Sequence, residues 1–461
     1  MKKLSLIVLI FLSVIGLIFS GCAKQAPTPT PTPAPAPVPA GPKEILIGFC
    51  VPMTGMFAGF GQQAFGVQAA IDDINKQGGV YVKEFDRKIP ARLIVVNNES
   101  DPAKVGSLTE DLALRDKVNV LISPDEPCTL HNDISRVGNK YKIPQIICGG
   151  PFEPWYHGMR DTVEGHWPYT WFAGFSIATP QAPPRNVPGF TCVDTWFMYM
   201  DKVGAKTNTN MVAGVFASDD PDGIGWYATF PPELKKYGCT VVGVDKELGM
   251  FPMGTTDFTS IIDQWKAAGV QILWGNCPGP DFGTMWSQCY AKGFRPKIVL
   301  CGRAPLFPVD VVSWGTKPPL GWGVGVECWW SPAYPPADFP GIGSTTAASL
   351  ADKYLATGQA LNRGIGHGYV GAQIMFDAIQ RAGSLNGDAI NAALGKTDMK
   401  SINGLIKFDP ESHFSAMPLA LGQWFYEPAK AQPWTEYIVC SALSNIPEEA
   451  KPLFPIPGLY P

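Results

Sequence analysis

The sequence is poor in charged residues. Only 16% of its 461 residues are Asp, Glu, Lys or Arg, and 36 basic side chains face 40 acidic ones, which gives a formal net charge of −4. No cluster of Lys and Arg is present. A chain without a surplus of positive charge gains little affinity for a phosphate backbone. The composition therefore argues against nucleic-acid binding, while 46% apolar residues indicate a chain that folds.

Motifs of catalysis and metal binding are also missing. The sequence contains no HExxH, no GxSxG, no CxxC and no complete GxGxxG, and none of its five histidines stands beside a nucleophile at motif spacing. We therefore expect neither an enzyme, nor a metal site, nor a cofactor. Most of the five histidines are expected to be surface or hinge residues; they are His131, His157, His166, His367 and His413.

Cysteines are scattered and not arranged in a framework of close pairs. Several lie within apolar runs, where cysteine behaves as a small hydrophobic residue. Although exported proteins often pair their cysteines, this spacing predicts mostly buried free thiols. The ten that follow Cys22 are Cys50, Cys128, Cys148, Cys192, Cys239, Cys277, Cys289, Cys301, Cys328 and Cys440.

The only long hydrophobic run is at the N-terminus. A cationic start precedes an almost unbroken apolar stretch from Leu4 to Phe19, which is short for a membrane span of roughly 20 residues. Phe19-Ser20-Gly21-Cys22 resembles a bacterial lipobox, although leucine is usual at the first position. We therefore predict a signal peptide at residues 1–21 and lipidation of Cys22; a membrane-spanning anchor is the alternative.

A proline-rich segment follows the predicted lipidation site. Residues 26–42 read APTPTPTPAPAPVPAGP, in which each proline favours extended backbone. At about 3.1 Å per residue, such a tether holds the folded part roughly 50 Å from the lipid. Residues 22–43 are therefore predicted to be a lipid-anchored linker, and the protein is predicted to be extracytoplasmic, in the periplasm or on the outer face of the membrane.

Beyond the linker, short apolar runs alternate with segments of helical periodicity. A continuous apolar run such as Ile45–Val51 is typical of a strand buried on both faces, and repeated βα alternation implies a parallel sheet. The first series has strands at 45–51, 91–96, 118–123 and 145–148, and helices at 62–75, 102–115 and 129–141.

A second series of the same kind begins after an aromatic bridge at residues 167–175. Two open sheets in tandem usually face each other, and the loops at the carboxyl ends of their strands meet in a cleft. The sequence therefore predicts an α/β fold with a ligand site between two lobes. The second series has strands at 211–217, 240–247, 272–275 and 297–301, helices at 191–203, 226–237, 259–268, 282–291, 370–382 and 387–395, and a hairpin at 404–409.

Residues 47–79, IGFCVPMTGMFAGFGQQAFGVQAAIDDINKQGG, resemble the opening of the leucine/isoleucine/valine-type substrate-binding proteins of ABC importers. Further matching segments extend the resemblance over residues 44–440. The resemblance implies the type I periplasmic-binding fold, with three crossovers between two lobes that close on a ligand by hinge motion. It implies lobe I at 44–168 and 304–395, and lobe II at 169–303 and 396–461.

The resemblance also implies ligand-binding positions in the N-terminal part. Phe60 stands where the family places a cleft aromatic, although it can equally be a packing residue. Cys128 and Thr129 open a helix whose amides and hydroxyl suit a carboxylate, or they form an ordinary helix start. Gly150 offers backbone groups, and Phe152 replaces the family threonine that holds the amino-acid head group.

Further positions follow in the second series. Asp222, Asn276 and Cys277 fall near family tyrosines, and Trp171 lies in an aromatic cluster that suits a flat solute or packs the lobe edges. Arg303 stands close to the family glutamate that receives the substrate ammonium. An arginine there repels an ammonium and attracts a carboxylate, unless it forms an interlobe salt bridge.

These features predict a lipid-anchored protein that delivers a small organic solute to the permease and ATPase subunits of an ABC importer. An amino acid or a related carboxylate or amide is the expected solute, and aromatic compounds are among the candidates. The alternative is a ligand-sensing receptor module of the same fold, although such modules usually continue into a membrane span and a cytoplasmic domain. We expect a monomer.

Overall fold

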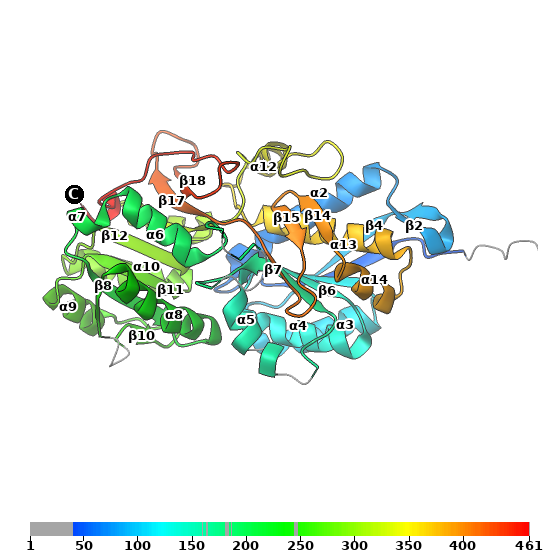
Figure 1. Cartoon of the computed structure of the whole chain (residues 1–461), viewed down its shortest axis with the longest axis horizontal. Helices are drawn as coiled ribbons and strands as arrows, with labels where there is room; N and C mark the ends of the chain where they lie inside the picture. Colours follow the sequence, from blue (N-terminus) through cyan, green and yellow to red (C-terminus); the bar gives the residue numbers. More distant parts are fainter. Residues whose placement is uncertain are drawn as a thin grey trace, which may run out of the picture. The chain divides into compact units, whose positions relative to one another are not determined.

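The computed structural model describes residues 40–460 apart from 159, 163–164, 180–183, 186 and 244–247. The predicted signal peptide, Cys22 and most of the linker lie outside the described residues. The chain divides into Met1–Pro39 and a compact unit, Ala40–Pro461, which holds both main sheets (Figure 1). Among the described helices, none is long and apolar enough to cross a membrane.

The first main sheet is parallel throughout and forms the centre of the first lobe. Its helices α2, α13 and α14 lie on one side in Figure 1, and α3, α4 and α5 lie on the other. The helices are α2 (Gln63–Lys76), α3 (Pro102–Leu114), α4 (Cys128–Tyr141), α5 (Phe152–Gly158), α13 (Ile365–Ala382) and α14 (Gly387–Leu394). The strand order is β16 (Phe414–Ala416), β7 (Thr170–Phe175), β6 (Gln145–Pro151), β5 (Val120–Ser123), β1 (Ile45–Val51), β4 (Ala91–Asn97).

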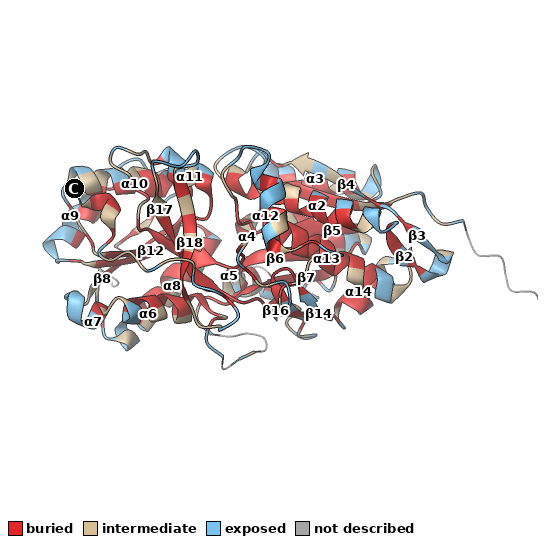
Figure 2. Cartoon of the chain, turned by 90° about the horizontal axis from the view of Figure 1, so that it is seen from above, coloured by how far each residue is buried: buried red, intermediate tan, exposed pale blue. Residues whose placement is uncertain are grey.

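The second main sheet is parallel until its last two strands, which are antiparallel. Its order is β10 (Met250–Phe251), β8 (Val212–Ser218), β11 (Ile272–Cys277), β12 (Ile298–Arg303), β13 (Gly325–Cys328), β17 (Ala420–Tyr426), β18 (Trp434–Ser441), with β9 (Thr240–Val242) beside β8. Figure 2 shows α6 (Cys192–Lys202), α7 (Ala205–Asn208) and α8 (Pro221–Tyr237) on one side of it, and α9 (Thr259–Ala267), α10 (Gly279–Ala291) and α11 (Pro308–Ser313) on the other.

Both faces of the second sheet are buried, which explains why its strands are apolar without alternation. On β11, Leu273 packs into the core beneath α9 and α10, and its neighbour Trp274 packs into the core beneath α6 and α8. The side chains of successive strand residues point to opposite faces, so half of the side chains of every strand lie on each face of the sheet. The two-lobed α/β fold predicted from the sequence is confirmed, with parallel sheets covered by helices on both faces.

Strand pairing divides the chain differently from the expected lobe boundaries. The aromatic stretch predicted as a bridge forms β7, which pairs with β6 in the first sheet because all six of its residues are buried there. Conversely, β13 joins β12 and β17 in the second sheet, whereas β16 pairs with β7 in the first. Within the described residues, the main chain passes between the two sheets after β7, after β13 and after β16.

Smaller elements complete the unit. They are the hairpin β2 (Val80–Val82) and β3 (Arg87–Ile89), the helix α12 (Ala347–Leu355), and the hairpin β14 (Asp398–Ser401) and β15 (Gly404–Lys407), which corresponds to the hairpin predicted at 404–409. The prediction for the cysteines is also confirmed, because all ten cysteines from Cys50 to Cys440 are buried and free.

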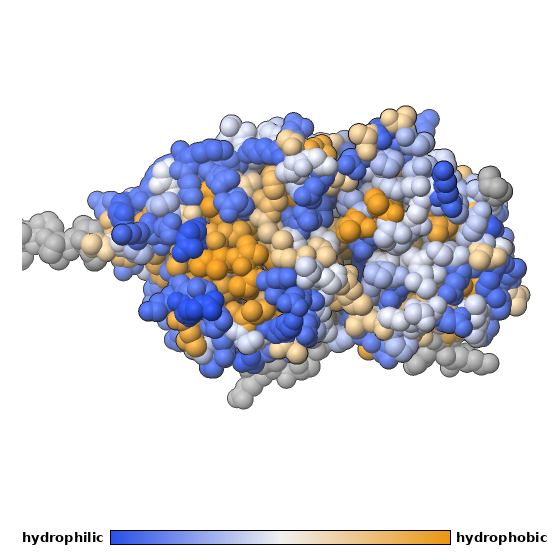
Figure 3. Space-filling view, turned by 180° about the vertical axis from the view of Figure 1, so that it is seen from behind, coloured by the Kyte–Doolittle hydropathy of each residue, from blue (hydrophilic) through white to orange (hydrophobic). Residues whose placement is uncertain are grey.

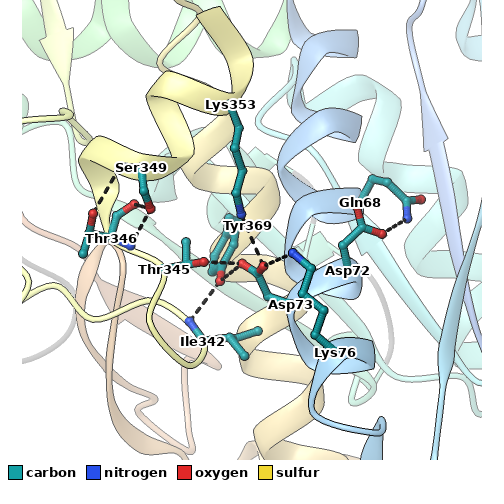
Figure 4. A network of polar contacts seen from close by, with 10 residues as sticks. All are labelled: Gln68, Asp72, Asp73, Lys76, Ile342, Thr345, Thr346, Ser349, Lys353 and Tyr369. Carbon is teal, nitrogen blue, oxygen red and sulfur yellow. Dashed lines mark hydrogen bonds and ion pairs between the residues drawn. The ribbon is translucent and has the colours of Figure 1, made fainter. Parts of the chain in front are cut away.

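A buried carboxylate joins three helices of the first lobe (Figure 4). Asp73 on α2 accepts hydrogen bonds from the hydroxyls of Thr345 (2.5 Å) and Tyr369 (3.0 Å), and Lys353 on α12 lies 3.3 Å away. Burial alone would raise the pKa of Asp73, but these hydrogen bonds and the Lys353 charge outweigh it and lower the pKa. The network therefore fixes α12 and the loop before it against α2 and α13.

The first sheet ends at β4, whose outer edge has no strand partner among the described residues. Its apolar side chains are only partly covered, and Val95 is 39% exposed. Figure 3 shows hydrophobic residues gathered on the same lobe, on the side opposite to that seen in Figure 1. The other strands of the first sheet are almost wholly buried, so this edge is the exception within that sheet (Figure 2).

Candidate functional site

A small cavity lies where the carboxyl ends of the parallel strands of both lobes meet. Its volume is about 20 Å³, which is room for about one water molecule. It is lined by Phe60, Asp125, Glu126, Pro127, Gly150, Pro151 and Phe175 from the first lobe, and by Asp222, Trp226, Asn276, Arg303, Leu306, Glu327 and Trp329 from the second lobe and the segment that follows β13.

Strand ends and helix starts place these side chains. Asp125 and Glu126 lie in the loop between β5 and α4. Pro127 follows them as the N-cap residue, so they stand just before the first turn of the helix. In the second lobe, Asp220 caps α8 by accepting a hydrogen bond from the Gly223 amide at 3.3 Å. This cap sets the first turn of α8 so that Asp222 lines the cavity.

Arg303 is the last residue of β12, and its guanidinium is held within its own lobe. Nη1 and Nη2 donate to the two carboxylate oxygens of Asp220 at 2.9 and 3.1 Å, and Nη2 also donates to the hydroxyl of Ser218. Asp222 lies 3.4 Å from Nη1. The alternative of an interlobe salt bridge is therefore wrong for this pair, because Asp220, the N-cap of α8, and Arg303, on β12, both belong to the second lobe.

The two aspartates that share Arg303 differ in proton affinity. Burial would raise the pKa of Asp220, but attraction to Arg303 and its hydrogen bonds outweigh burial and hold the pKa below its usual value. Burial dominates at Asp222, where the repulsion of Asp220 adds to it, so its pKa rises to about 6 despite Arg303. Conversely, the two aspartates overcome the effect of burial on Arg303 and raise its pKa.

Three further carboxylates lie in the cavity wall. Asp125, Glu126 and Glu327 are each at most 4% exposed, and burial raises the pKa of all three well above the usual value. Glu327 Oε1 accepts from the backbone amide of Arg303 at 3.3 Å. Neighbouring charges add to the effect, since Asp222 raises the pKa of Asp125.

The nearby histidines do not supply positive charge. His131 Nε2 lies 2.9 Å from the carbonyl of Pro124, which only accepts, so Nε2 carries the proton. His367 Nδ1 accepts from the indole of Trp329 at 2.6 Å. Burial lowers the pKa of His131 to about 4 and that of His367 well below its usual value, so both rings are neutral near pH 7.

Aromatic rings form the apolar part of the wall. Phe175 stacks on Trp329 with ring centroids 5.1 Å apart, and Trp226 lies 6.1 Å from Phe175. From the opposite side, Phe60 meets Phe307 edge to face at 4.6 Å. The cavity therefore combines aromatic surface with carboxylates. The described residues contain no group of three or more His, Cys, Asp or Glu that could hold a metal ion.

Comparison with known proteins identifies the family. The model of the periplasmic binding proteins matches residues 44–431. This chain belongs to the periplasmic binding protein family. The resemblance stated from the opening residues is thereby confirmed, as is the expectation of a substrate-binding protein instead of an enzyme.

Solved structures share the fold of this periplasmic binding protein. A leucine-binding protein of Thermotoga maritima has 16% identity and a TM-score of 0.65, with 86% of this chain and 99% of that chain covered. A solute-binding protein of an ABC transporter from Rhodopseudomonas palustris, in complex with 3,4-dihydroxybenzoic acid, has 18% identity and a TM-score of 0.61, with 88% and 99% covered. A branched-chain amino acid transporter substrate-binding protein of Streptococcus pneumoniae, in complex with isoleucine, has 17% identity and a TM-score of 0.61, with 90% and 100% covered.

The structure brings five of the predicted ligand-binding residues of this periplasmic binding protein to one cavity. Phe60 and Gly150 line it from the first lobe, and Asp222, Asn276 and Arg303 line it from the second. Gly150 has φ +85°, and a Cβ there would lie 3.0 Å from Oδ1 of Asp125, so glycine suits both the backbone and the close approach.

The other predicted residues lie outside the cavity wall. Cys128 and Thr129 open α4 behind the lining residue Pro127. Phe152 is 1% exposed and packs against Phe414 at 4.6 Å in a separate hydrophobic cluster.

Trp171 and Cys277 also point elsewhere. The Trp171 ring stacks on His413 at 3.8 Å, and its indole donates to Asn391 at 2.7 Å, so it belongs to the first lobe. Cys277 lies in the core beneath α9 and α10, on the far face of the second sheet.

Several lining residues were not predicted. Asp125 and Glu126 form an acidic pair just after an apolar strand, and this pattern in the sequence could have indicated their place in the site. Glu327, by contrast, is on β13, a four-residue strand without a clear pattern, and Trp329 follows it. Their position depends on the pairing of β13 with its neighbour β12 and with β17, whose paired residues lie nearly a hundred positions further along the chain.

Proposed function

We propose that this chain is the extracytoplasmic solute-binding component of an ABC importer, which captures a small organic solute by closure of two lobes. The observation that supports it most directly is the cavity, which receives side chains from both lobes at the carboxyl ends of their strands. Family membership favours this role over the sensing module.

Closure is the proposed mechanism of capture. A solute that contacts both lobes binds the closed arrangement more tightly than the open one. The difference between these two binding free energies is the free energy with which it favours closure. The crossings of the main chain after β7, β13 and β16 are the only covalent links between the sheets among the described residues, and they are where a hinge acts. The closed form is then presented to the permease and ATPase subunits.

The anchoring at the membrane is part of the proposal. Lipidation of Cys22 would tether the folded unit through the proline-rich linker. A monomer suffices, since one chain supplies both walls of the cavity.

Thermal denaturation of Ala40–Pro461 with a panel of amino acids, aromatic acids, short carboxylates, amides and amines tests the binding role. A solute that binds only the folded state adds about 2.7 kcal/mol at 100 times its dissociation constant. A compound that stabilises the unit identifies its solute class, and a complete lack of response contradicts the proposed role.

Closure has its own assay, because every native cysteine in the described residues is buried. Cysteines introduced at Lys76 and Lys236, which are 69% and 79% exposed and lie on different lobes, therefore accept fluorophores selectively. Energy transfer between the dyes should change on addition of the stabilising solute. As a control, both dyes are placed on the same lobe. An equal change in energy transfer in this control would argue against closure.

A further inference from the structure

Unsatisfied acceptors outnumber unsatisfied donors in the wall of the cavity between the lobes. Among the described lining residues, buried atoms without a hydrogen-bond partner are Asp125 Oδ2, Glu327 Oε2 and Asn276 Oδ1, and Arg303 Nε is the one such donor on a charged group. Glu126 is set apart from these, because its carboxylate interacts with Asn98, which lowers its pKa against the effect of burial. Asn276 is 1% exposed, and its carboxamide nitrogen faces Asp222, which leaves Oδ1 as the free atom. A ligand that donates hydrogen bonds would satisfy this wall.

The charges of the wall are equally unbalanced. Arg303 already serves Asp220 and Asp222, and both neighbouring histidines are neutral. Asp125 and Glu126 therefore have no cationic partner within 4 Å among the described residues, and Glu327 has only a backbone amide. A buried carboxylate is costly unless it is paired.

The unpaired carboxylates come from both lobes. Asp125 and Glu126 belong to the first lobe, whereas Asp222 and Glu327 belong to the second. Asp222 raises the pKa of Asp125, and Asp125 raises the pKa of Glu327, so carboxylates of the two lobes repel each other where they meet. A positive charge between them would replace this repulsion by attraction and would thereby couple binding to closure.

The rest of the wall favours an organic cation over a metal ion. The acidic side chains are spread around the cavity and form no metal-holding group. Between them lie the faces and edges of Phe60, Phe175, Trp226 and Trp329, which attract a cation that has lost its water and cover an apolar group.

We propose that the cleft between the lobes, opened beyond the water-sized cavity of this structure, binds a small organic cation, an amidinium or ammonium group on an apolar body, in place of an amino acid or a carboxylate. This inference rests on the proposed function, because it names the solute class of that same cleft. It corrects the expectation that Arg303 attracts a solute carboxylate, since the guanidinium of Arg303 is occupied by Asp220.

Two matched series of compounds test the charge alone. Acetamidinium, acetamide and acetate share one planar outline, and benzamidinium, benzamide and benzoate share a larger one. With Ala40–Pro461, we expect the amidinium of at least one series to bind roughly 10- to 100-fold more tightly than its neutral and anionic counterparts. Equal or tighter binding of the amide or carboxylate, or no binding of either amidinium, overturns the inference.

A pair of variants locates the effect. Glu327→Gln should weaken amidinium binding roughly 10-fold or more and should weaken the binding of the matched neutral amide by less. Because this substitution removes a buried carboxyl group that has no cationic partner, the unliganded variant should melt at the same temperature or higher. Glu233→Gln is the control, since Glu233 pairs with Lys236 on the surface of α8 at 3.4 Å. Equal loss in both variants overturns the assignment of Glu327.

The outcomes separate this inference from the proposed function. If a carboxylate or an amide binds and closes the lobes, the cation inference fails while the solute-binding role stands. If no compound of the wider panel binds, the proposed function fails as well.

Discussion

Removal of the Arg303 guanidinium should destabilise the fold strongly. In Arg303→Met, Asp220 and Asp222 keep their buried positions and lose the only cation near them among the described residues. Both partners of the Arg303–Asp220 pair are 5% exposed, and the pair is a two-bond fork of 2.9 and 3.1 Å. Breaking a buried pair from one side costs about 3–5 kcal/mol. We expect that loss in the free energy of unfolding at pH 7.

Urea denaturation of Ala40–Pro461 measures this loss, and a double-mutant cycle assigns it. Asp220→Asn combined with Arg303→Met should recover part of the stability, with a coupling of about 1–3 kcal/mol. Arg115→Met is the matched control, because Arg115 is 63% exposed and water and salt screen its ion pairs. Additive effects in the cycle, or equal losses in Arg303→Met and Arg115→Met, would refute the reasoning.

The same pair predicts a pH dependence. The pKa of Asp220 is lowered in the folded protein. Its contribution to stability is therefore present above its unfolded pKa of about 3.9 and is lost as the pH falls through the folded value. The difference between wild type and Arg303→Met should accordingly shrink in urea titrations carried from pH 7 towards pH 4 and below. A constant difference over that range would contradict the pairing.

Two further predictions concern residues outside the cavity. Asp73→Asn should lower the free energy of unfolding at pH 7. Since the pKa of Asp73 is lowered in the fold, this loss should narrow in the same urea assay as the pH falls below about 3.9, and Asp72→Asn, which changes the exposed neighbour, is the control. Phe152→Ala should lower the free energy of unfolding by about 3–5 kcal/mol, because Phe152 is buried and packs against Phe414. It should leave the dissociation constant of the identified solute unchanged, and a changed affinity would show that Phe152 belongs to the binding site.

Local patterns of the sequence determined much of the architecture. The apolar run at Ile45–Val51 is β1 with the same bounds, and the helix expected at 102–115 is α3 at Pro102–Leu114. About 10 to 15 consecutive residues are enough to indicate a buried strand or an amphipathic helix, so both can be predicted without knowledge of the fold. The burial of the cysteines follows from their apolar neighbours in the same way.

The content of the site was predictable only in part. Phe60, Gly150, Asp222, Asn276 and Arg303 reach the cavity because they stand at strand ends or helix starts. Whether a side chain there is free to bind depends on its partners, which the sequence around it does not reveal.

Arg303 shows the difference between what sequence and tertiary structure decide. Its position at the end of a strand followed from the apolar run before it, but the carboxylate that occupies it is 83 residues away in the chain. Likewise, Glu327 lines the same cavity as Asp125 only because β13 pairs with β17, which lies far along the chain. Local patterns thus specify the elements, their order and the two-lobed α/β class. Which charges are paired and which remain in the cleft depends on distances between remote segments, so it is revealed by the folded chain alone.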